Sequence, residues 1–127
     1  MMHDRSAVSR VLNEREQQLL LRLIAVCNKN DNYKQQIDHL RVTGRCNCGC
    51  PTVDLCSKET EHRPKPPHKN IVDAEFILPN GHVIGVILWA NDGQIMGLEL
   101  YPCNFQEPFE IPELAFLANV MLNEEAV

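Results

Sequence analysis

The residues most able to do chemistry in this 127-residue chain are cysteines that crowd into one short stretch. Four of the six cysteines lie within eleven residues of the segment RCNCGCPTVDLC: Cys46, Cys48, Cys50 and Cys56. Thiolates bind zinc, attack electrophiles and exchange disulfides, so this stretch decides whether the protein has a reactive site. These four cysteines are the candidate ligands of a metal site, with zinc as the candidate ion.

The spacing of the cysteines sets a geometric condition on any metal site. On a straight strand, Cys46, Cys48 and Cys50 share one face but spread over roughly 13 Å, at about 3.3 Å per residue. Zinc binds sulfur at about 2.3 Å, so a straight strand cannot bring three ligands to one ion. A bend at Gly49, which can adopt a positive φ, would let Cys48 and Cys50 converge. Cys56 would then return from the next strand.

Three uses of these cysteines stay open. The sequence favours free, mostly buried thiols, because one cysteine-dense stretch is a weaker zinc signal than two separated C-x-x-C pairs. A structural zinc site over 46–56 is the alternative. The third use is a redox or nucleophilic role for Cys48 or Cys50, activated by the neighbouring Arg45. We assign no catalytic residue and no organic cofactor, because the chain has no G-x-S-x-G and no glycine loop for phosphate.

A wider pattern resembles a set of small bacterial proteins. Three segments carry it: LNEREQQLLLRLIA, VTGRCNCGCPTVDL and GVILWANDGQIMGLELYP. The shared order is an amphipathic N-terminal helix, a G-R-C-x-C-G-C-P stretch and a D-G hairpin that ends in L-E-x-Y. The resemblance implies that the first three clustered cysteines belong to the pattern, whereas Cys27, Cys56 and Cys103 are incidental. It implies no activity, because no function is known for that set.

Charge is divided unevenly along the chain. Residues 1–69 contain all twelve Lys and Arg and eight acids, a net charge of +4, whereas residues 70–127 contain nine acids and a net charge of −9. This division fits two ends that attract each other, and it also fits an acidic surface that attracts a basic protein and repels nucleic acid. The leading functional hypothesis is therefore a small binding module, similar to an immunity protein, that docks on a basic protein partner. A small zinc-binding protein is the alternative, a thiol-dependent enzyme comes third, and we favour a protein that is not an enzyme.

Nothing in the sequence has the character of a membrane or export segment. The chain has no apolar run of 18 residues, and its polar start, MMHDRSAVSR, has no apolar stretch after it of the signal-peptide kind. We therefore expect a cytoplasmic protein with no membrane partner, whose cysteines are reduced or bound to metal.

Two helices are expected near the N-terminus. Asn13 and Glu16 have the spacing of a capping box, and apolar residues follow at helical spacing, which predicts a helix over 14–27. A second, shorter helix is predicted from Asp31, with Tyr33, Ile37 and Leu40 on one side. After the second helix, the sequence predicts two short strands, from Arg41 and from Pro51. A flexible polar loop over 58–70 follows, with three prolines and no apolar side chain between 58 and 70.

The second half of the chain predicts a sheet. Alternating apolar residues and the turn sequences PNG and NDG predict a three-stranded antiparallel meander over 71–101. Its central strand, 82–90, is apolar on both sides, so we expect it to be covered on both faces. The segment 112–122 predicts a C-terminal helix, which packs on the sheet or forms a homodimer. The expected fold is a single α+β domain over 1–127: two N-terminal helices on a mainly antiparallel sheet of about five strands, with a C-terminal helix.

Overall fold

The computed structural model of the protein describes residues 5–57 and 68–123. In that part of the chain, nearly half of the residues lie in seven strands, and the helical residues lie in two short α-helices and one 3-10 turn. The helical elements are α1 (Glu14–Ile24), α2 (Asn30–Ile37) and the turn η1 (Leu114–Phe116). The strands are β1 (Arg5–Val11), β2 (Leu40–Cys46), β3 (Val53–Ser57), β4 (Lys69–Ile77), β5 (Val83–Asn91), β6 (Gln94–Pro102) and β7 (Leu117–Leu122).

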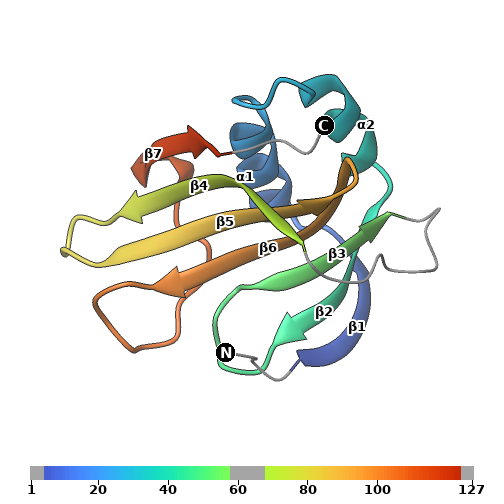
Figure 1. Ribbon diagram of the computed structural model, residues 1–127. Helices are drawn as coiled ribbons and strands as arrows, with labels where there is room; N and C mark the ends of the chain where they lie inside the picture. The colour runs from blue at the N-terminus through green and yellow to red at the C-terminus, as the bar shows by residue number, and fades with distance from the viewer. Residues whose placement is uncertain (1–4, 58–67, 124–127) are drawn as a thin grey trace.

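The strands form one antiparallel sheet in the order β1-β2-β3-β6-β5-β4-β7 (Figure 1). The predicted meander is confirmed, because β5 pairs with β4 on one side and with β6 on the other. Both predicted turns are also present, with positive φ at Gly81 (92°), Asp92 (54°) and Gly93 (76°). The prediction of about five strands is wrong, since the sheet has two further strands at its edges, β1 and β7.

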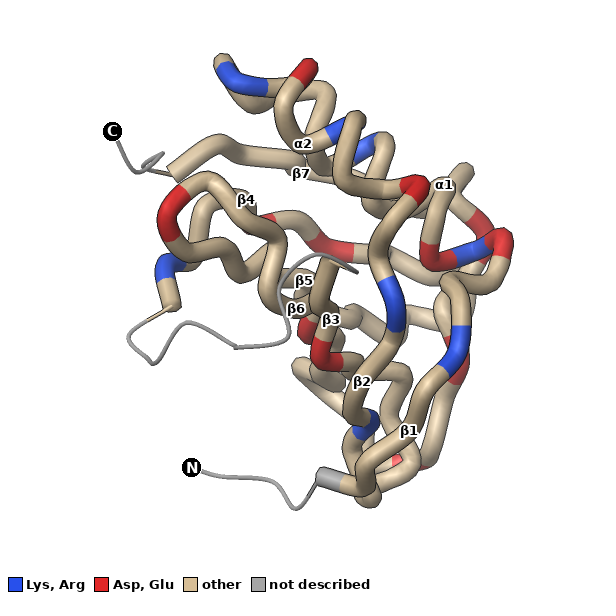
Figure 2. The backbone as a smooth tube through the Cα atoms, turned by 90° about the vertical axis from the view of Figure 1, so that its right-hand side faces the viewer, with Lys and Arg blue, Asp and Glu red and all other residues tan. Residues whose placement is uncertain are grey.

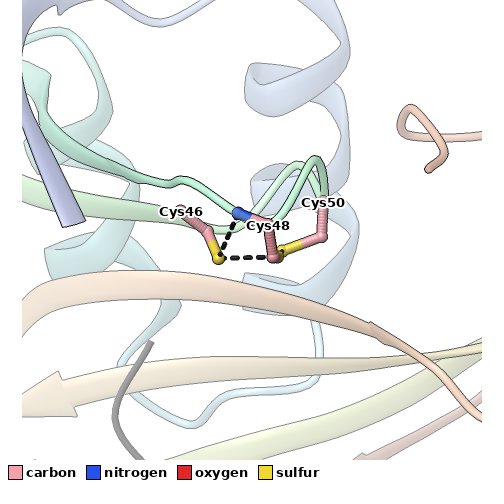
Figure 3. Close-up of side chains that lie close together, drawn as sticks. All are labelled: Cys46, Cys48 and Cys50. Atoms are coloured by element: carbon pink, nitrogen blue, oxygen red, sulfur yellow. Dashed lines mark hydrogen bonds between the residues drawn. The ribbon is translucent and has the colours of Figure 1, made fainter. Parts of the chain in front are cut away.

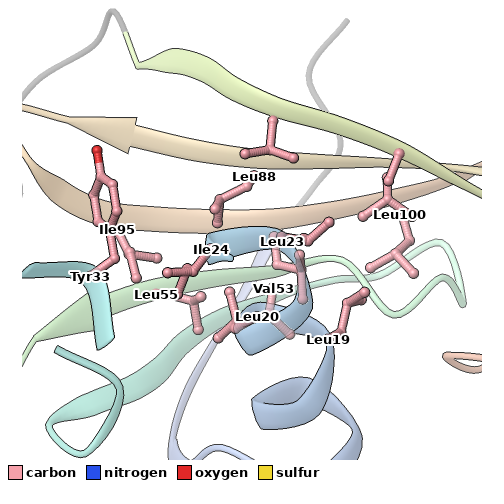
Figure 4. Packing of buried hydrophobic residues seen from close by; sticks show 14 of the residues in the cluster. Leu19, Leu20, Leu23, Ile24, Tyr33, Val53, Leu55, Leu88, Ile95 and Leu100 are labelled. Carbon is pink, nitrogen blue, oxygen red and sulfur yellow. The ribbon is translucent and has the colours of Figure 1, made fainter. Parts of the chain in front are cut away.

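Helix α1 begins as its sequence predicts. Asn13 Oδ1 accepts a hydrogen bond from the Glu16 backbone N–H (2.8 Å), and Glu16 Oε1 accepts one from the Asn13 N–H (2.9 Å), which completes the capping box. The helix ends at Ile24, earlier than predicted. Its apolar face packs on the sheet (Figure 4), and each fully buried leucine contributes about 1.5–3 kcal/mol. The buried apolar side chains of α1 are Leu19, Leu20, Leu23 and Ile24.

Helix α2 is held against the turn between β5 and β6 by its polar side chains. Gln36 Nε2 donates to the Gly93 carbonyl oxygen (2.7 Å), and Gln36 Oε1 accepts from the Ile95 N–H (2.9 Å). Asn32 Nδ2 donates to the same Gly93 oxygen (3.0 Å), while the Tyr33 ring is buried in the core. Leu40, which the sequence assigns to this helix, instead begins β2.

Both helices lie on the same face of the sheet, and the other face carries no helix in the described residues. On β5, Val86 and Leu88 are fully buried in the core beneath the helices, whereas Ile87 and Trp89, which point the other way, are only partly buried. The expectation that β5 is covered on both faces is therefore wrong. Apolar residues on both sides of a central strand do not require a layer on each side, because single exposed apolar side chains are common.

The predicted C-terminal helix is absent. Residues 114–116 form the turn η1, and the chain then continues as β7, which pairs antiparallel with β4. Leu117 and Val120 lie three residues apart, which resembles helical spacing, but the register shifts between them and Asn119 takes a positive φ of 54°. The register shift places one extra residue in β7, so apolar residues that would lie two apart on a regular strand lie three apart here. The homodimer that we expected through this helix loses its basis.

Strand β1 has no counterpart in the sequence prediction. It is short and polar, and its pairing with β2 is interrupted between Ala7 and Arg10, so alternation is weak. The loop predicted over 58–70 lies outside the described residues as far as residue 67, and Lys69 and Asn70 already belong to β4.

The two faces of β5 give a direct test of this arrangement. Val86→Asp should abolish cooperative folding, because it buries an unpaired charge at a cost of several kcal/mol. Ile87→Asp, one residue along on the open face, should lower the free energy of unfolding by about 1 kcal/mol or less. Urea denaturation followed by circular dichroism measures both variants. Equal destabilisation by the two substitutions would contradict the one-sided packing of the sheet.

Candidate metal centre

The cysteine stretch occupies the end of the β2–β3 hairpin, where the chain bends as predicted. Strand β2 ends at Cys46, and Gly49 takes a φ of 92°, a conformation open mainly to glycine. Thr52 fixes the far side of the bend, since its Oγ1 donates to the Leu100 carbonyl oxygen and accepts from the Leu100 N–H, both at 2.9 Å. A hydrogen bond from the Cys46 N–H to the Thr52 carbonyl oxygen (3.2 Å) closes the bend. The hairpin end is thus tied to β6.

An irregularity in β2 decides which way the neighbouring side chains point. The β2–β3 register shifts between Val42 and Gly44, and Arg45 then lies opposite Val53. Directly paired residues of antiparallel strands point to the same side, so Arg45 lies on the face that Val53 shares with the helices. Cys46, the next residue, points to the other face.

The three cysteines of the bend come together (Figure 3). Cys46 Sγ lies 2.6 Å from Cys48 Sγ, Cys48 Sγ lies 2.8 Å from Cys50 Sγ, and all three sulfurs are within 4.8 Å of one another. Two sulfurs on one tetrahedral zinc ion, each at about 2.3 Å, lie about 3.8 Å apart. Each neighbouring pair therefore needs to separate by about 1 Å to accept an ion between the three sulfurs.

The three thiols differ in exposure, and Cys46 and Cys48 also differ in acidity. Cys46 is 4% exposed, Cys50 is partly buried and Cys48 is exposed. Burial, together with a hydrogen bond to Cys48, raises the pKa of Cys46 to about 12. At Cys48 burial also raises the pKa, but hydrogen bonds from the Cys46 and Cys50 thiols and from backbone N–H groups outweigh it, so the pKa lies below its ordinary value. Of Cys46 and Cys48, Cys48 is thus the first to become a thiolate.

The fourth predicted ligand does not join the cluster. Cys56 pairs with Arg41 in the β2–β3 register, which is five residues from Cys46 along β2, or roughly 16 Å at about 3.3 Å per residue. Its Sγ approaches the Ser57 carbonyl oxygen (3.3 Å) instead. Of the cysteines that we took as incidental, Cys27 is buried and Cys103 is exposed.

Sequence reasoning did not find the residues that hold the bend in place. Thr52 anchors it to β6, and Pro108 packs so closely on Gly49 that a Cβ added there would lie 3.3 Å from the Pro108 Cβ. Neither residue has a local signal, because both contacts join segments about 50 residues or more apart in the chain.

No protein-family model matches the chain, and neither the curated proteins nor the solved structures contain a match to it. In the described residues, no helix is long and apolar enough to cross a membrane. The function therefore has to be argued from the geometry of the site itself.

The unequal pKa values predict a pH-dependent order of alkylation in the metal-free protein. Because the thiolate is the nucleophile, Cys48 should react with iodoacetamide at a lower pH than Cys46, whose proton is held up to about pH 12. Peptide mass mapping after short pulses from about pH 6 to about pH 10 measures the order. Equal rates at Cys46 and Cys48 across this range would contradict the arrangement.

Proposed function

We propose that this chain is a small metal-binding protein in which Cys46, Cys48 and Cys50 hold one thiophilic ion, with zinc as the expected ion. The observation that carries the proposal is the convergence of three sulfurs, from a five-residue bend, to within 4.8 Å of one another. Thiolate ligands select zinc and copper(I) over the harder cations that prefer oxygen. A cytoplasmic location, where thiols stay reduced, fits the proposal.

The ligand set suggests an open site and not a closed structural one. In residues 5–57 and 68–123, no fourth Cys, His, Asp or Glu joins the three sulfurs. Structural zinc sites close the tetrahedron with four protein ligands, whereas sites with three protein ligands leave a position for water or substrate. We therefore propose that the ion keeps one exchangeable position, unlike the closed structural zinc site expected from the sequence as an alternative to free thiols.

Zinc should bind stoichiometrically and stabilise the fold. Untagged protein should contain one zinc per chain by elemental analysis, and the Cys48→Ser variant should contain none. Binding to the folded state alone adds about 4 kcal/mol when free zinc is 1,000-fold above Kd, so a chelator should lower the melting temperature of the wild type but not of Cys48→Ser. Because thiolates are the ligands, zinc should also protect these cysteines from alkylation.

Two matched controls keep this test specific. Cys56→Ser and Cys103→Ser should retain zinc, because neither sulfur belongs to the cluster. Gly49→Ala and Gly81→Ala place the same strain on a φ of 92°, but only the first meets Pro108 and lies in the cysteine bend, so only the first should weaken zinc binding. Metal-free wild-type protein with three freely titrating thiols would refute the proposal.

A second candidate function is supported by the open face of the sheet. Among the described residues, Lys and Arg lie on or next to the helices, on β1 and β2 and at the start of β4, whereas β3, β5, β6 and β7 carry none (Figure 2). In the paired strands, Asp73 lies opposite Ile87, which lies opposite Glu99, and Glu75 lies opposite Gly85, which lies opposite Tyr101. The partly buried face of these strands is therefore both apolar and acidic.

The side chains on this face are arranged in contact with one another. The Tyr101 ring covers Gly85, where a Cβ would lie 2.1 Å from the ring, and Trp89 Nε1 donates to Glu99 Oε1 (2.9 Å). Burial and the nearby negative charges of Cys103, Asp73, Glu99 and Glu75 raise the pKa of Tyr101. A basic partner protein would complement this face, so docking on such a partner is the second candidate function. The two functions are compatible, because the cysteine bend lies at the end of a different hairpin.

A further inference from the structure

A cavity of about 510 Å³ lies beside the cysteine bend. Its walls come from three segments: the end of β1 with the start of α1, the bend from Arg45 to Val53, and residues 109–111 ahead of η1. The volume falls within the range of small-molecule sites, about 300–1,000 Å³. Cys50 belongs both to the wall of this cavity and to the sulfur cluster.

Three arginines line the cavity, and their side chains differ in how many hydrogen bonds they already make. Arg10 is occupied, because its two Nη atoms donate to the two carboxylate oxygens of the buried Glu16, each at 2.8 Å. Arg15 uses one Nη1 donor, to the Ile111 carbonyl oxygen (3.0 Å). The Arg45 backbone pairs with β1 and β3, but its side chain makes no hydrogen bond or ion pair with any residue that the structure describes. The wall of this cavity therefore carries the guanidinium of Arg45, which has no partner among the described residues, and that of Arg15, which donates one hydrogen bond.

The charge of the walls is opposite in sign to that of the whole protein. The ionisable residues that line the cavity, besides the Cys50 thiol, are Arg10, Arg15, Arg45, Glu16 and Glu110. With three arginines and two glutamates, their net charge is +1, whereas the chain carries −5. Glu16 is already neutralised by Arg10, so Glu110 is the one lining carboxylate that competes for the other two arginines.

We propose that this cavity binds a small anion, through a carboxylate or phosphate group held by Arg45 and Arg15, next to Cys50. The planar guanidinium pairs with either group through two parallel hydrogen bonds. Where a metal occupies the sulfur cluster, the anion lies beside the open fourth position and supplies the missing ligand; this part alone rests on the proposed metal function. Zinc with three thiolates has a net charge of −1, so the arginines are needed to admit an anion there.

Titration with two probes tests the site and identifies the group. Inorganic phosphate and malonate are titrated into zinc-loaded protein, and binding is followed by amide chemical shifts and calorimetry. One or both should bind saturably with shifts centred on residues 45–53, and the tighter probe identifies the preferred group. Arg45→Gln should weaken binding about tenfold or more, because it removes a charge-assisted pair.

The matched control is Arg41→Gln, which makes the same change of charge on the same strand. Arg41 lies outside the cavity and donates to Ser9 Oγ (3.1 Å), so its loss should leave anion affinity within about twofold of wild type. Absence of saturable binding for both probes, or equal weakening by Arg45→Gln and Arg41→Gln, would overturn the anion site.

Two further measurements separate the anion site from the metal site. Cys48→Ser, which should bind no metal, should still bind the anion in an Arg45-dependent way, so a failure of the metal proposal does not remove this one. In cobalt-loaded protein, the anion should shift the visible absorption bands of the ion, because it enters the coordination sphere. Unchanged bands together with Arg45-dependent binding would overturn the contact between anion and metal.

Discussion

The structure depends on one constraint: two short helices can cover only one face of a sheet of seven strands. The four buried apolar residues of α1 set the position of that face, and Val86 and Leu88 meet them from β5. Ile87 and its paired neighbours Asp73 and Glu99, which alternate to the other side, remain partly exposed. Because that side has no covering layer in the described residues, it can carry the carboxylates of β4 and β6 at little desolvation cost. The charge asymmetry of the sequence thus becomes a difference between surfaces.

Local signals predicted the elements whose pairing is also local. The capping box of α1 and the turn residues of the 71–101 meander each lie within a few consecutive residues, so the sequence alone identifies the helix and the meander. The edge strands β1 and β7 could not be found this way, because each is made a strand by its neighbour: β2 pairs with one and β4 with the other. At β7, the register shift near Asn119 also makes a strand pattern look helical, so tertiary pairing overrides the periodicity.

In the candidate site, too, only the features with local signals could be predicted from the sequence. The bend at Gly49 and the convergence of three cysteines follow from a glycine and a spacing, both of which can be read within five residues. Cys56 was expected to return to the cluster, but the hairpin register places it beside Arg41, and register depends on the pairing of whole strands. The sequence could not predict the cavity for the same reason. Its arginines lie as far apart in the chain as Arg10 and Arg45, and another wall comes from Ile111.

The register shift between Val42 and Gly44 links the fold to the chemistry. Without it, Arg45 would continue the alternation of β2 and point away from the core face, on the side where Cys46 now lies. Gly44 lies at the shift, and a Cβ at this position would lie 2.5 Å from Asp54 Oδ2, so a larger residue would require the Asp54 side chain to move. The shift turns Arg45 toward the start of α1 and leaves Cys46 with the other thiols, so consecutive residues serve the two adjacent sites that we propose, one for a cation and one for an anion. A site of this kind needs a strand end where the two faces meet, and the sequence Gly44-Arg45-Cys46 occupies such an end.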